Sequence, residues 1–354
     1  MVQPLTLEEF LSAPGIILDV RSPSEHQQGR IPGAVSFPLF TDAERAQVGT
    51  CYKQQGREAA VELGFAIAGP KFAQFIATAK QLTSDRRIRV HCWRGGMRSG
   101  AVAWVLEMAG FEVTTLIGGY KTFRRWALGT FQLPKPIVIL GGMTGTGKTD
   151  ILTSLAQQGM QVLDLEALAG HRGSSYGALG LPPQPSNEQF ENEIAVQWAA
   201  LDCQKPVWIE AESKRIGQCR IPDALFAQME QAAILEIIRP KMERLLALVE
   251  VYGTADRQAL VTATERIQKK LGGQQTQQAI EFIRQGKLLE GFEIILNYYD
   301  KTYTYDLQRR RAVIYPVDVT GLTASESAKI LLEKTQEVFS SSLTAVQAAQ
   351  AATV

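Results

Sequence analysis

The sequence predicts an α/β protein built from two parallel-sheet domains, and three observations lead to that prediction. Short apolar runs rich in β-branched residues alternate with segments of helical apolar spacing, the pattern of parallel sheets covered by helices on both faces. A glycine-rich loop that carries a cysteine follows one such run, and a phosphate-loop pattern follows another. A length of 354 residues is enough for two or three domains.

The first domain is expected to span residues 1–132 and to alternate strands with helices. Apolar β-branched runs predict its strands, and helical spacing of apolar side chains predicts its helices. The expected elements are a helix at 7–13, strands at 16–20 and 35–37, a helical stretch at 56–82, a strand at 88–92, a helix at 99–109, a strand at 112–116 and a short helix at 122–128. Two prolines then punctuate a linker, Pro134 and Pro136.

The second domain is expected to span residues 136–335, with a helical insertion at about 240–299. Its predicted strands lie at 137–140, 161–164, 207–210, 233–238 and 312–317. A helix at 188–201 should begin after Ser186 as its N-cap, with Gln189 as the capping-box partner. The tail, 336–354, is expected to be loose because it ends in a stretch rich in Ala, Ser, Thr and Gln.

Cys92 is the candidate catalytic residue of the first domain. It lies between a predicted strand and a predicted helix, in the segment His91-Cys92-Trp93-Arg94-Gly95-Gly96-Met97-Arg98-Ser99. Glycines let backbone N–H groups turn inward as an anion nest, and the helix dipole adds positive potential. Arg94, Gly95, Gly96 and Arg98 would form this anion cradle. We therefore expect a lowered pKa for the Cys92 thiol, a nucleophilic thiolate, and affinity for tetrahedral oxyanions.

The second domain carries a phosphate-loop pattern in its required strand–loop–helix context. The apolar run 137–140 leads into the segment 142–149, which has the form G-x-x-x-x-G-K-T. Loop amides would wrap a diphosphate, Lys148 would reach its outer oxygens, and Thr149 would offer its hydroxyl to a magnesium ion. The candidate diphosphate-binding residues are Gly142, Thr144, Gly145, Gly147, Lys148 and Thr149.

Other substrate contacts are predicted in the same domain, each with an alternative. Glu210 ends an apolar strand and could organise magnesium, but Asp164 competes for that role, and either could be a solvated strand end. The loop 170–177 holds anion-binding side chains, or is simply a polar surface loop. Its candidate residues are His171, Arg172 and Ser174.

Composition limits the classes of function. A net charge of +1 gives no overall basic field, so a nucleic-acid partner would need a local basic patch. The four cysteines are widely spaced and form no zinc-ligand pattern, which favours a reduced protein. Neither a signal-peptide pattern nor a run of about 18 apolar residues is present, so we expect a cytoplasmic protein without a membrane partner.

The first domain resembles the rhodanese family. The segments Leu18 to His26 and Gly29 to Ala34 are similar to the opening rhodanese motif, and Leu116 to Tyr120 is similar to its closing segment. Cys92 falls where that family has its persulfide-forming cysteine. Its loop is one residue longer than in ordinary sulfurtransferases, and Cys92-x5-Arg98-Ser99 also fits the signature of cysteine phosphatases. The longer loop suits a larger anion than thiosulfate.

Nearly the whole chain resembles the tRNA 2-selenouridine synthases, which join a rhodanese-like domain to a P-loop NTPase-like α/β domain with a helical insertion. The resemblance rests on the cysteine loop, the phosphate loop and the segments 170–177, 209–213 and 298–300. It implies that sulfur in wobble-position 2-thiouridine of tRNA is replaced by selenium, through S-geranylation with geranyl diphosphate and then selenation with selenophosphate. The implied partners are tRNA and these two small substrates. No tightly bound cofactor is expected, and Thr149 could hold a magnesium ion.

Two other functions fit parts of the sequence. A P-loop kinase fused to a rhodanese-like cysteine phosphatase would use ATP at the phosphate loop and Cys92 for phosphate release. A non-enzymatic sensor would use an inert rhodanese module to regulate an NTPase, but it would have little need for a cysteine between glycines and two arginines.

Overall fold

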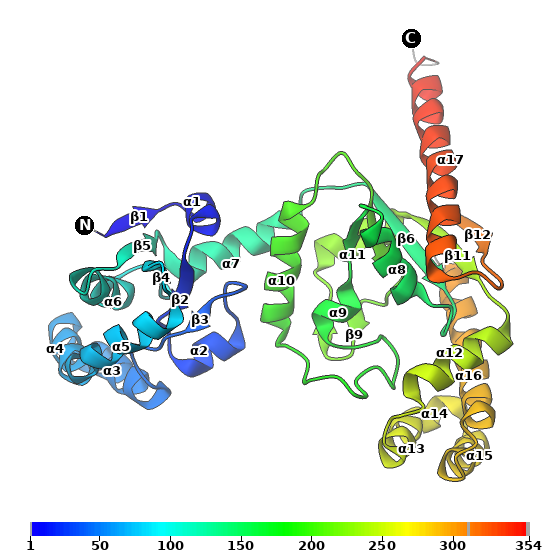
Figure 1. The fold of residues 1–354 in the computed structure, drawn as a ribbon, viewed down its shortest axis with the longest axis horizontal. Coiled ribbons are helices and arrows are strands. Elements are labelled where there is room, and N and C mark those ends of the chain that lie inside the picture. The colour runs from blue at the N-terminus through cyan, green and yellow to red at the C-terminus, as the bar shows by residue number, and fades with distance from the viewer. Residues whose placement is uncertain (1, 310–311, 352–354) are drawn as a thin grey trace. The chain divides into compact units, whose positions relative to one another are not determined.

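The computed structural model describes residues 2–309 and 312–351. The chain divides into two compact units, shown in Figure 1. The first comprises Met1–Thr130 and Ser186–Val196, and the second comprises Phe131–Pro185 and Gln197–Val354. Both units contain a parallel sheet with helices, so the predicted α/β class is confirmed.

The first unit is built on a parallel sheet that has five strands in the part of the chain described. The order is β1-β5-β4-β2-β3, which places β4 in the middle. The strands are β1 (Gln3–Leu5), β2 (Ile16–Asp19), β3 (Val35–Ser36), β4 (Arg87–His91) and β5 (Glu112–Leu116). The sequence does not predict β1, because three residues with a single buried side chain show no periodicity.

Seven α-helices accompany this sheet within the described part of residues 2–130. They are α1 (Leu7–Ser12), α2 (Pro23–Gln28), α3 (Asp42–Gln55), α4 (Arg57–Ala68), α5 (Phe72–Leu82), α6 (Met97–Met108) and α7 (Gly119–Thr130). The helical stretch predicted at 56–82 is interrupted by a 3-10 turn at Gly69–Lys71, where Pro70 has no N–H to continue the α-helical ladder. Helix α3 has no buried residue along its described length and therefore no apolar period to predict it.

The core of the first unit holds α6 against the middle of the sheet. Val90 of β4 and Leu18 of β2 are buried with Val102 and Leu106 of α6. These apolar contacts fix the start of α6 next to the carboxyl end of β4. The loop between them, with Cys92, is therefore held at both ends by buried structure.

The second unit also contains a parallel sheet of five strands among its described residues, in the order β12-β11-β6-β8-β7. The strands are β6 (Ile137–Gly142), β7 (Gln161–Leu163), β8 (Val207–Glu210), β11 (Ala233–Ile238) and β12 (Ile314–Asp318). A short antiparallel pair, β9 (Arg215–Ile216) and β10 (Cys219–Arg220), lies outside it. The central strand, β6, leads directly into the phosphate loop.

Helices of the second unit either flank the sheet or form the insertion. The flanking helices are α8 (Lys148–Gln157), α9 (Leu165–Ala169), α11 (Asp223–Gln231) and α17 (Ala324–Ala351). The insertion comprises α12 (Lys241–Tyr252), α13 (Arg257–Arg266), α14 (Gln268–Leu271), α15 (Gly273–Arg284) and α16 (Leu288–Arg309). It has a buried apolar cluster of its own, which includes Leu260, Ile283 and Phe292.

Helix α10 (Asn187–Ala200) belongs to both units, because its residues up to Val196 are part of the first. The Ser186 hydroxyl accepts the Gln189 N–H at 3.0 Å, as its predicted N-cap role requires. The expected return bond from Gln189 is replaced: its side-chain oxygen accepts the Arg30 N–H at 2.8 Å. A contact between segments distant in sequence thus takes the place of a local capping box.

Most of the C-terminal segment 336–354 belongs to a helix. Helix α17 continues to Ala351, in keeping with the high helix propensity of its alanines and glutamines, and 352–354 lie outside the described residues. Across the part of the chain that the structure describes, no helix is both long enough and apolar enough to span a bilayer.

Candidate functional site

The cysteine loop of the first unit connects β4 to α6 at the carboxyl end of the central strand, where parallel sheets usually bind ligands. Gly95 has a φ of +63°, and a Cβ there would lie 2.4 Å from the Leu116 carbonyl oxygen. Only glycine fits this turn without strain. The Cys92 carbonyl accepts the Tyr120 N–H at 2.9 Å, so it faces α7.

Cys92 is buried, and its sulfur is surrounded by groups that favour the thiolate. Burial raises the pKa of the thiol. The Ser99 hydroxyl, 3.3 Å from Sγ, the N–H groups of Gly96 and Ser99, and the charge of Arg98 together outweigh burial, so the pKa lies below its ordinary value. This is the direction expected from the sequence. Ser99 also contributes to the lowered pKa, and the glycines and arginines of the sequence motif do not indicate its role.

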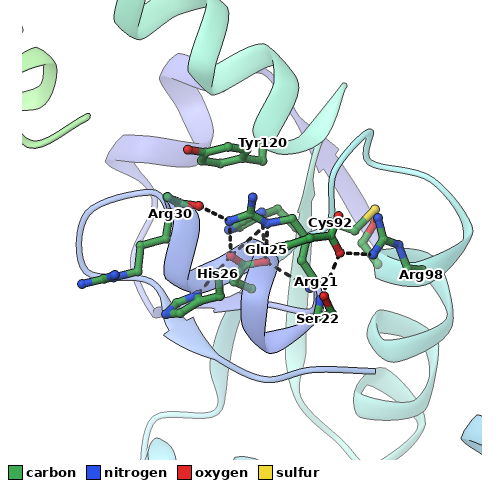
Figure 2. Close-up of polar contacts among 12 residues, drawn as sticks. Arg21, Ser22, Glu25, His26, Arg30, Cys92, Arg98 and Tyr120 are labelled. Atoms are coloured by element: carbon green, nitrogen blue, oxygen red, sulfur yellow. Dashed lines mark hydrogen bonds and ion pairs between the residues drawn. The ribbon is translucent and has the colours of Figure 1, made fainter. Parts of the chain in front are cut away.

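The two arginines of the cradle differ in their surroundings. Arg98 donates to Glu25 Oε2 at 2.9 Å, and Glu25 also accepts the Ser22 N–H (Figure 2). Glu25 therefore holds the Arg98 guanidinium beside the loop, and the pKa of this carboxyl is lowered although burial opposes it. Arg94 is exposed on the loop and available to a ligand from solvent.

A buried ion pair between Asp19 and Arg21 lies in the same unit and stabilises the elements around the cysteine loop. Asp19, at the end of β2, accepts three side-chain hydrogen bonds from the buried Arg21 and one interaction from His26 at 3.1 Å. Burial alone would raise the pKa of Asp19, but these partners hold it far below the ordinary range. Arg21 also lies against the Tyr120 ring (Figure 2), with its guanidinium carbon 3.8 Å from the ring centre. The network fixes β2 and α7 beside the cysteine loop.

The phosphate loop of the second unit connects β6 to α8. Its glycines at 142, 145 and 147 all have positive φ, and Gly147 precedes the first turn of α8. Lys148 Nζ donates to the Gly142 carbonyl at 2.9 Å and lies 3.4 Å from Glu210 Oε1. Lys148 therefore neutralises a carboxylate and folds back over its own loop.

The outer side of the phosphate loop is held by the insertion. Arg244 of α12 donates to the Thr144 carbonyl at 3.2 Å and forms a two-point ion pair with Asp300 of α16, at 2.8 Å for each bond. Tyr303 of the same helix accepts the Gly142 N–H at 2.8 Å. Thr144 is thus positioned through contacts that the sequence motif does not reveal.

Three carboxylates, Glu166, Glu210 and Glu212, meet next to Lys148, with ligand oxygens within 4.8 Å of one another. Burial and the charges of the other two raise the pKa of Glu166 to about 9. Burial also raises the pKa of Glu210, whose Oε2 is buried without a hydrogen-bond partner among the described residues. Carboxylate oxygens are preferred ligands of magnesium, so this donor set fits a divalent cation.

The two predicted acids have different places in this arrangement. Glu210 lies in the cluster and interacts with the Thr149 hydroxyl. Asp164 caps α9 by accepting the Ala167 N–H at 2.9 Å, and its charge adds to the repulsion at Glu210. Glu166 and Glu212 were not among the predicted residues. The available signal was the pair of acids two residues apart after a buried strand, in 209–213.

The loop 170–177 lies beside this cluster and the phosphate loop. A Cβ on Gly173 would come within 3 Å of Glu166 and Glu212 oxygens. Ser174 and Thr144 line the same small cavity, which is otherwise largely apolar and aromatic. His171 is buried and burial lowers its pKa, whereas Arg172 is exposed and donates to the Leu179 carbonyl. Within the second unit, Ser174 approaches the phosphate loop, while Arg172 stabilises its own loop.

The fold and the two loops define a protein that joins a rhodanese-like unit to a P-loop unit. The family model described as "Rhodanese-like domain" matches residues 4–125, and the one described as "tRNA 2-selenouridine synthase AAA domain" matches residues 135–329.

Relatives named tRNA 2-selenouridine synthase match most of the chain. The one from Marinobacter nauticus is 33% identical over 84% of this chain and 90% of its own length. The one from Shewanella oneidensis is 33% identical over 83% and 86%, and the one from Pseudomonas putida is 35% identical over 82% and 87%. The chain belongs to the tRNA 2-selenouridine synthase family.

Proposed function

We propose that this protein is an enzyme that replaces sulfur by selenium in wobble-position 2-thiouridine of tRNA, through an S-geranylated intermediate. The observation that carries the proposal is the pair of anion-binding loops in one chain of this family: one holds a thiol of lowered pKa, and the other holds Lys148 beside a carboxylate cluster. We assign selenophosphate to the first loop and geranyl diphosphate to the second.

Geranyl transfer is assigned to the second unit. The thiocarbonyl sulfur of the nucleoside forms a bond to C1 of the geranyl group while the C1–O bond breaks and its electron pair leaves with diphosphate. The N3 proton of the base passes to solvent. Loop amides and Lys148 would stabilise the charge that develops on the leaving diphosphate.

Magnesium is proposed as a partner of this step, held by Thr149 and by carboxylates of the cluster Glu166, Glu210 and Glu212. The donor set supports it, because the buried unpartnered oxygen of Glu210 and the mutual repulsion of the acids would both be relieved by a divalent cation. The ion would supply additional charge stabilisation for diphosphate. No tightly bound organic cofactor is proposed.

Alkylation prepares the base for the selenium step. A thiocarbonyl sulfur is a poor leaving group, whereas a thioether sulfur can leave as geranylthiolate. This difference lowers the barrier to displacement at C2 and explains why a prenyl donor would serve an enzyme that inserts selenium.

The selenium step is assigned to Cys92. We propose that its thiolate attacks phosphorus of bound selenophosphate, so that an S–P bond forms, the P–Se bond breaks and selenium leaves as hydrogenselenide. Hydrogenselenide then forms the C2–Se bond, the C2–S bond breaks, and the geranylthiolate takes a proton from water. Water hydrolyses the phosphocysteine to thiolate and phosphate. The arrangement of Cys92, Arg98 and Ser99 supports this assignment, because a thiolate stabilised by a hydroxyl and facing an anion cradle is suited to phosphoryl transfer.

The test uses purified protein and an anticodon stem-loop RNA containing 2-thiouridine. This RNA stands for tRNA, the proposed partner of the protein in the cytoplasm. Nucleoside mass spectrometry should detect geranylated thiouridine after addition of geranyl diphosphate and magnesium, and selenouridine after addition of selenophosphate. Robust ATP hydrolysis with no prenyl transfer would instead support the kinase–phosphatase alternative and contradict the proposal.

A further inference from the structure

An apolar groove lies beside the cysteine loop in the first unit. It encloses a cavity of about 360 Å³ lined by residues of α3 to α6 and of the segment before α3. The lining includes Val48, Val61, Phe65, Phe72, Met97 and Trp104. Small-molecule sites in proteins have volumes of about 300–1,000 Å³. The groove is therefore large enough for a chain of two isoprene units.

The protein's own side chains leave this groove open. Phe65, Met97 and Trp104 are each 55% exposed, whereas Ala60 and Ala68 beneath them are buried. Large apolar side chains gathered on one exposed surface usually mark a binding site, because their contact with water is unfavourable. An apolar ligand would remove that contact.

One end of the groove lies at the first turn of α6, which contacts Cys92 through Ser99. Met97, Ala101 and Trp104 are spaced four and three residues apart on α6, so they share the face that lines the groove. Ser99, in the same first turn, faces Cys92 with its hydroxyl 3.3 Å from Sγ. The groove therefore extends along α6 from the turn that contacts the thiol.

Positive charge lies at that same end of the groove, where Arg57 Nη2 of α4 is 3.9 Å from Met97 Sδ. Arg98 is the one charged residue among those that line the groove, and its charge also acts on Cys92. Glu25 holds the guanidinium in place at 2.9 Å. A ligand that complements this surface has a polar or anionic part near Arg98 and an apolar chain along α6.

We propose that this groove binds the prenyl chain of S-geranyl-2-thiouridine, and of the geranylthiol that leaves, while selenium replaces sulfur at the Cys92 loop. The inference rests on the proposed function and names the part of the substrate that the first unit recognises. With the chain in the groove, the C2–S bond would lie near the turn of Arg98, whose charge stabilises the negative charge that develops on sulfur. Burial of the chain also provides affinity that a methyl group lacks.

The test compares two anticodon stem-loops, one with S-geranyl- and one with S-methyl-2-thiouridine, on the full-length protein. Dissociation constants are measured by fluorescence anisotropy without selenophosphate, and selenouridine formation is measured separately with selenophosphate. Wild-type protein should prefer the geranylated RNA by at least about 10-fold in both measurements. Phe65→Ser, which removes an exposed wall, and Ala101→Phe, which fills the groove, should each reduce this preference towards unity.

Ala77→Phe on α5 is the matched control, because Ala77 is exposed and does not line the groove. It should retain the wild-type preference. Equal binding of both RNAs by wild-type protein would overturn the inference, and so would full preference in both groove variants. If Phe65→Ser weakened the binding of both RNAs by the same factor, the groove would contact RNA instead of the prenyl chain, and the inference would be overturned. Preferential binding with no selenation of either RNA would sustain the groove assignment and contradict the proposed function.

Discussion

The cysteine loop and the phosphate loop occupy equivalent places in two different sheets. Each follows the central strand of a five-stranded parallel sheet, as defined by the described residues, and leads into a helix; the cysteine loop turns at one glycine with positive φ, Gly95, and the phosphate loop at three. Both therefore present backbone N–H groups and a helix N-terminus to an anion. The shared geometry accounts for anion binding in general but does not explain why the two loops would perform different chemistry.

The difference lies in the charges next to each loop. Beside Cys92, carboxylates are matched by cations: Asp19 by Arg21, and Glu25 by Arg98. Beside the phosphate loop, three carboxylates of the cluster face Lys148. The first environment stabilises a negative charge on the protein's own sulfur, whereas the second places more carboxyl groups than cations together, so that Glu166 keeps its proton up to a pH of about 9 unless a cation joins the site. Side chains from elements distant in the sequence therefore give each loop its chemistry.

The largest effect is expected from Cys92→Ala, which removes the proposed nucleophile from one loop and leaves the other intact. Selenation should fall by about 10³-fold or more, as is usual when a nucleophile is removed. Geranylated thiouridine should still accumulate, measured by nucleoside mass spectrometry. Cys203→Ala, at an exposed cysteine, is the control. Loss of geranylation in a folded Cys92→Ala protein would contradict the division of labour between the loops.

The reciprocal change is Lys148→Ala. Loss of a donor that stabilises transition-state charge typically lowers a rate by about 10²–10³-fold, and we expect that loss in geranyl transfer. Pre-geranylated RNA with selenophosphate should restore selenation, because the cysteine loop is unchanged. Lys205→Ala, at an exposed lysine, serves as the control. Failure of the pre-geranylated RNA to restore selenation would show that the two loops do not act independently.

Glu166→Gln tests the crowding of carboxyl groups in the second unit. In metal-free protein the folded state raises the Glu166 pKa from 4.5 to about 9, so the folded chain retains a proton that the unfolded chain has lost. The free energy of unfolding should therefore fall as pH rises through this window. Since one pKa unit corresponds to about 1.4 kcal/mol, Glu166→Gln should be more stable than wild type at pH 8 and nearly equal at pH 5.

Thermal unfolding with EDTA would measure this difference, with Glu230→Gln on the exposed face of α11 as the control. Magnesium should stabilise wild type more than Glu166→Gln, because the variant lacks one proposed ligand. An equal magnesium effect on both proteins would remove Glu166 from the proposed cation site.

The smallest effect is expected from Ser99→Ala. Loss of a single hydrogen bond to the thiolate should raise the Cys92 pKa, since a hydrogen bond to a charged group contributes a net stabilisation of about 1.5–3 kcal/mol. Iodoacetamide alkylation against pH should give a midpoint below the ~8.5 of an ordinary cysteine in wild type and a higher one in the variant. Ser213→Ala in the second unit should leave the midpoint unchanged. A wild-type midpoint at or above ~8.5 would contradict the thiolate assignment.

Local patterns in the sequence account for the strands, most helices and both loops. Strand β11 begins and ends at the predicted residues, because its short segment is rich in isoleucine and leucine, as is typical of a buried strand. Glycines at turn positions and the spacing to Lys148 similarly identify the loops. Helix α3 and strand β1 were missed because neither carries an apolar period.

The sequence by itself determined the α/β class, the order of the two folds and the positions of Cys92 and Lys148, since each depends on residues adjacent in the chain. Tertiary structure decided which distant groups meet them. Glu25 reaches Arg98 across 73 positions of sequence, and Arg244 reaches Thr144 across 100. The Glu166–Glu210–Glu212 cluster and the groove along α6 likewise form only when separate elements pack together. Charge and hydrophobic contact act through space over a few ångströms, so spacing along the chain does not reveal them.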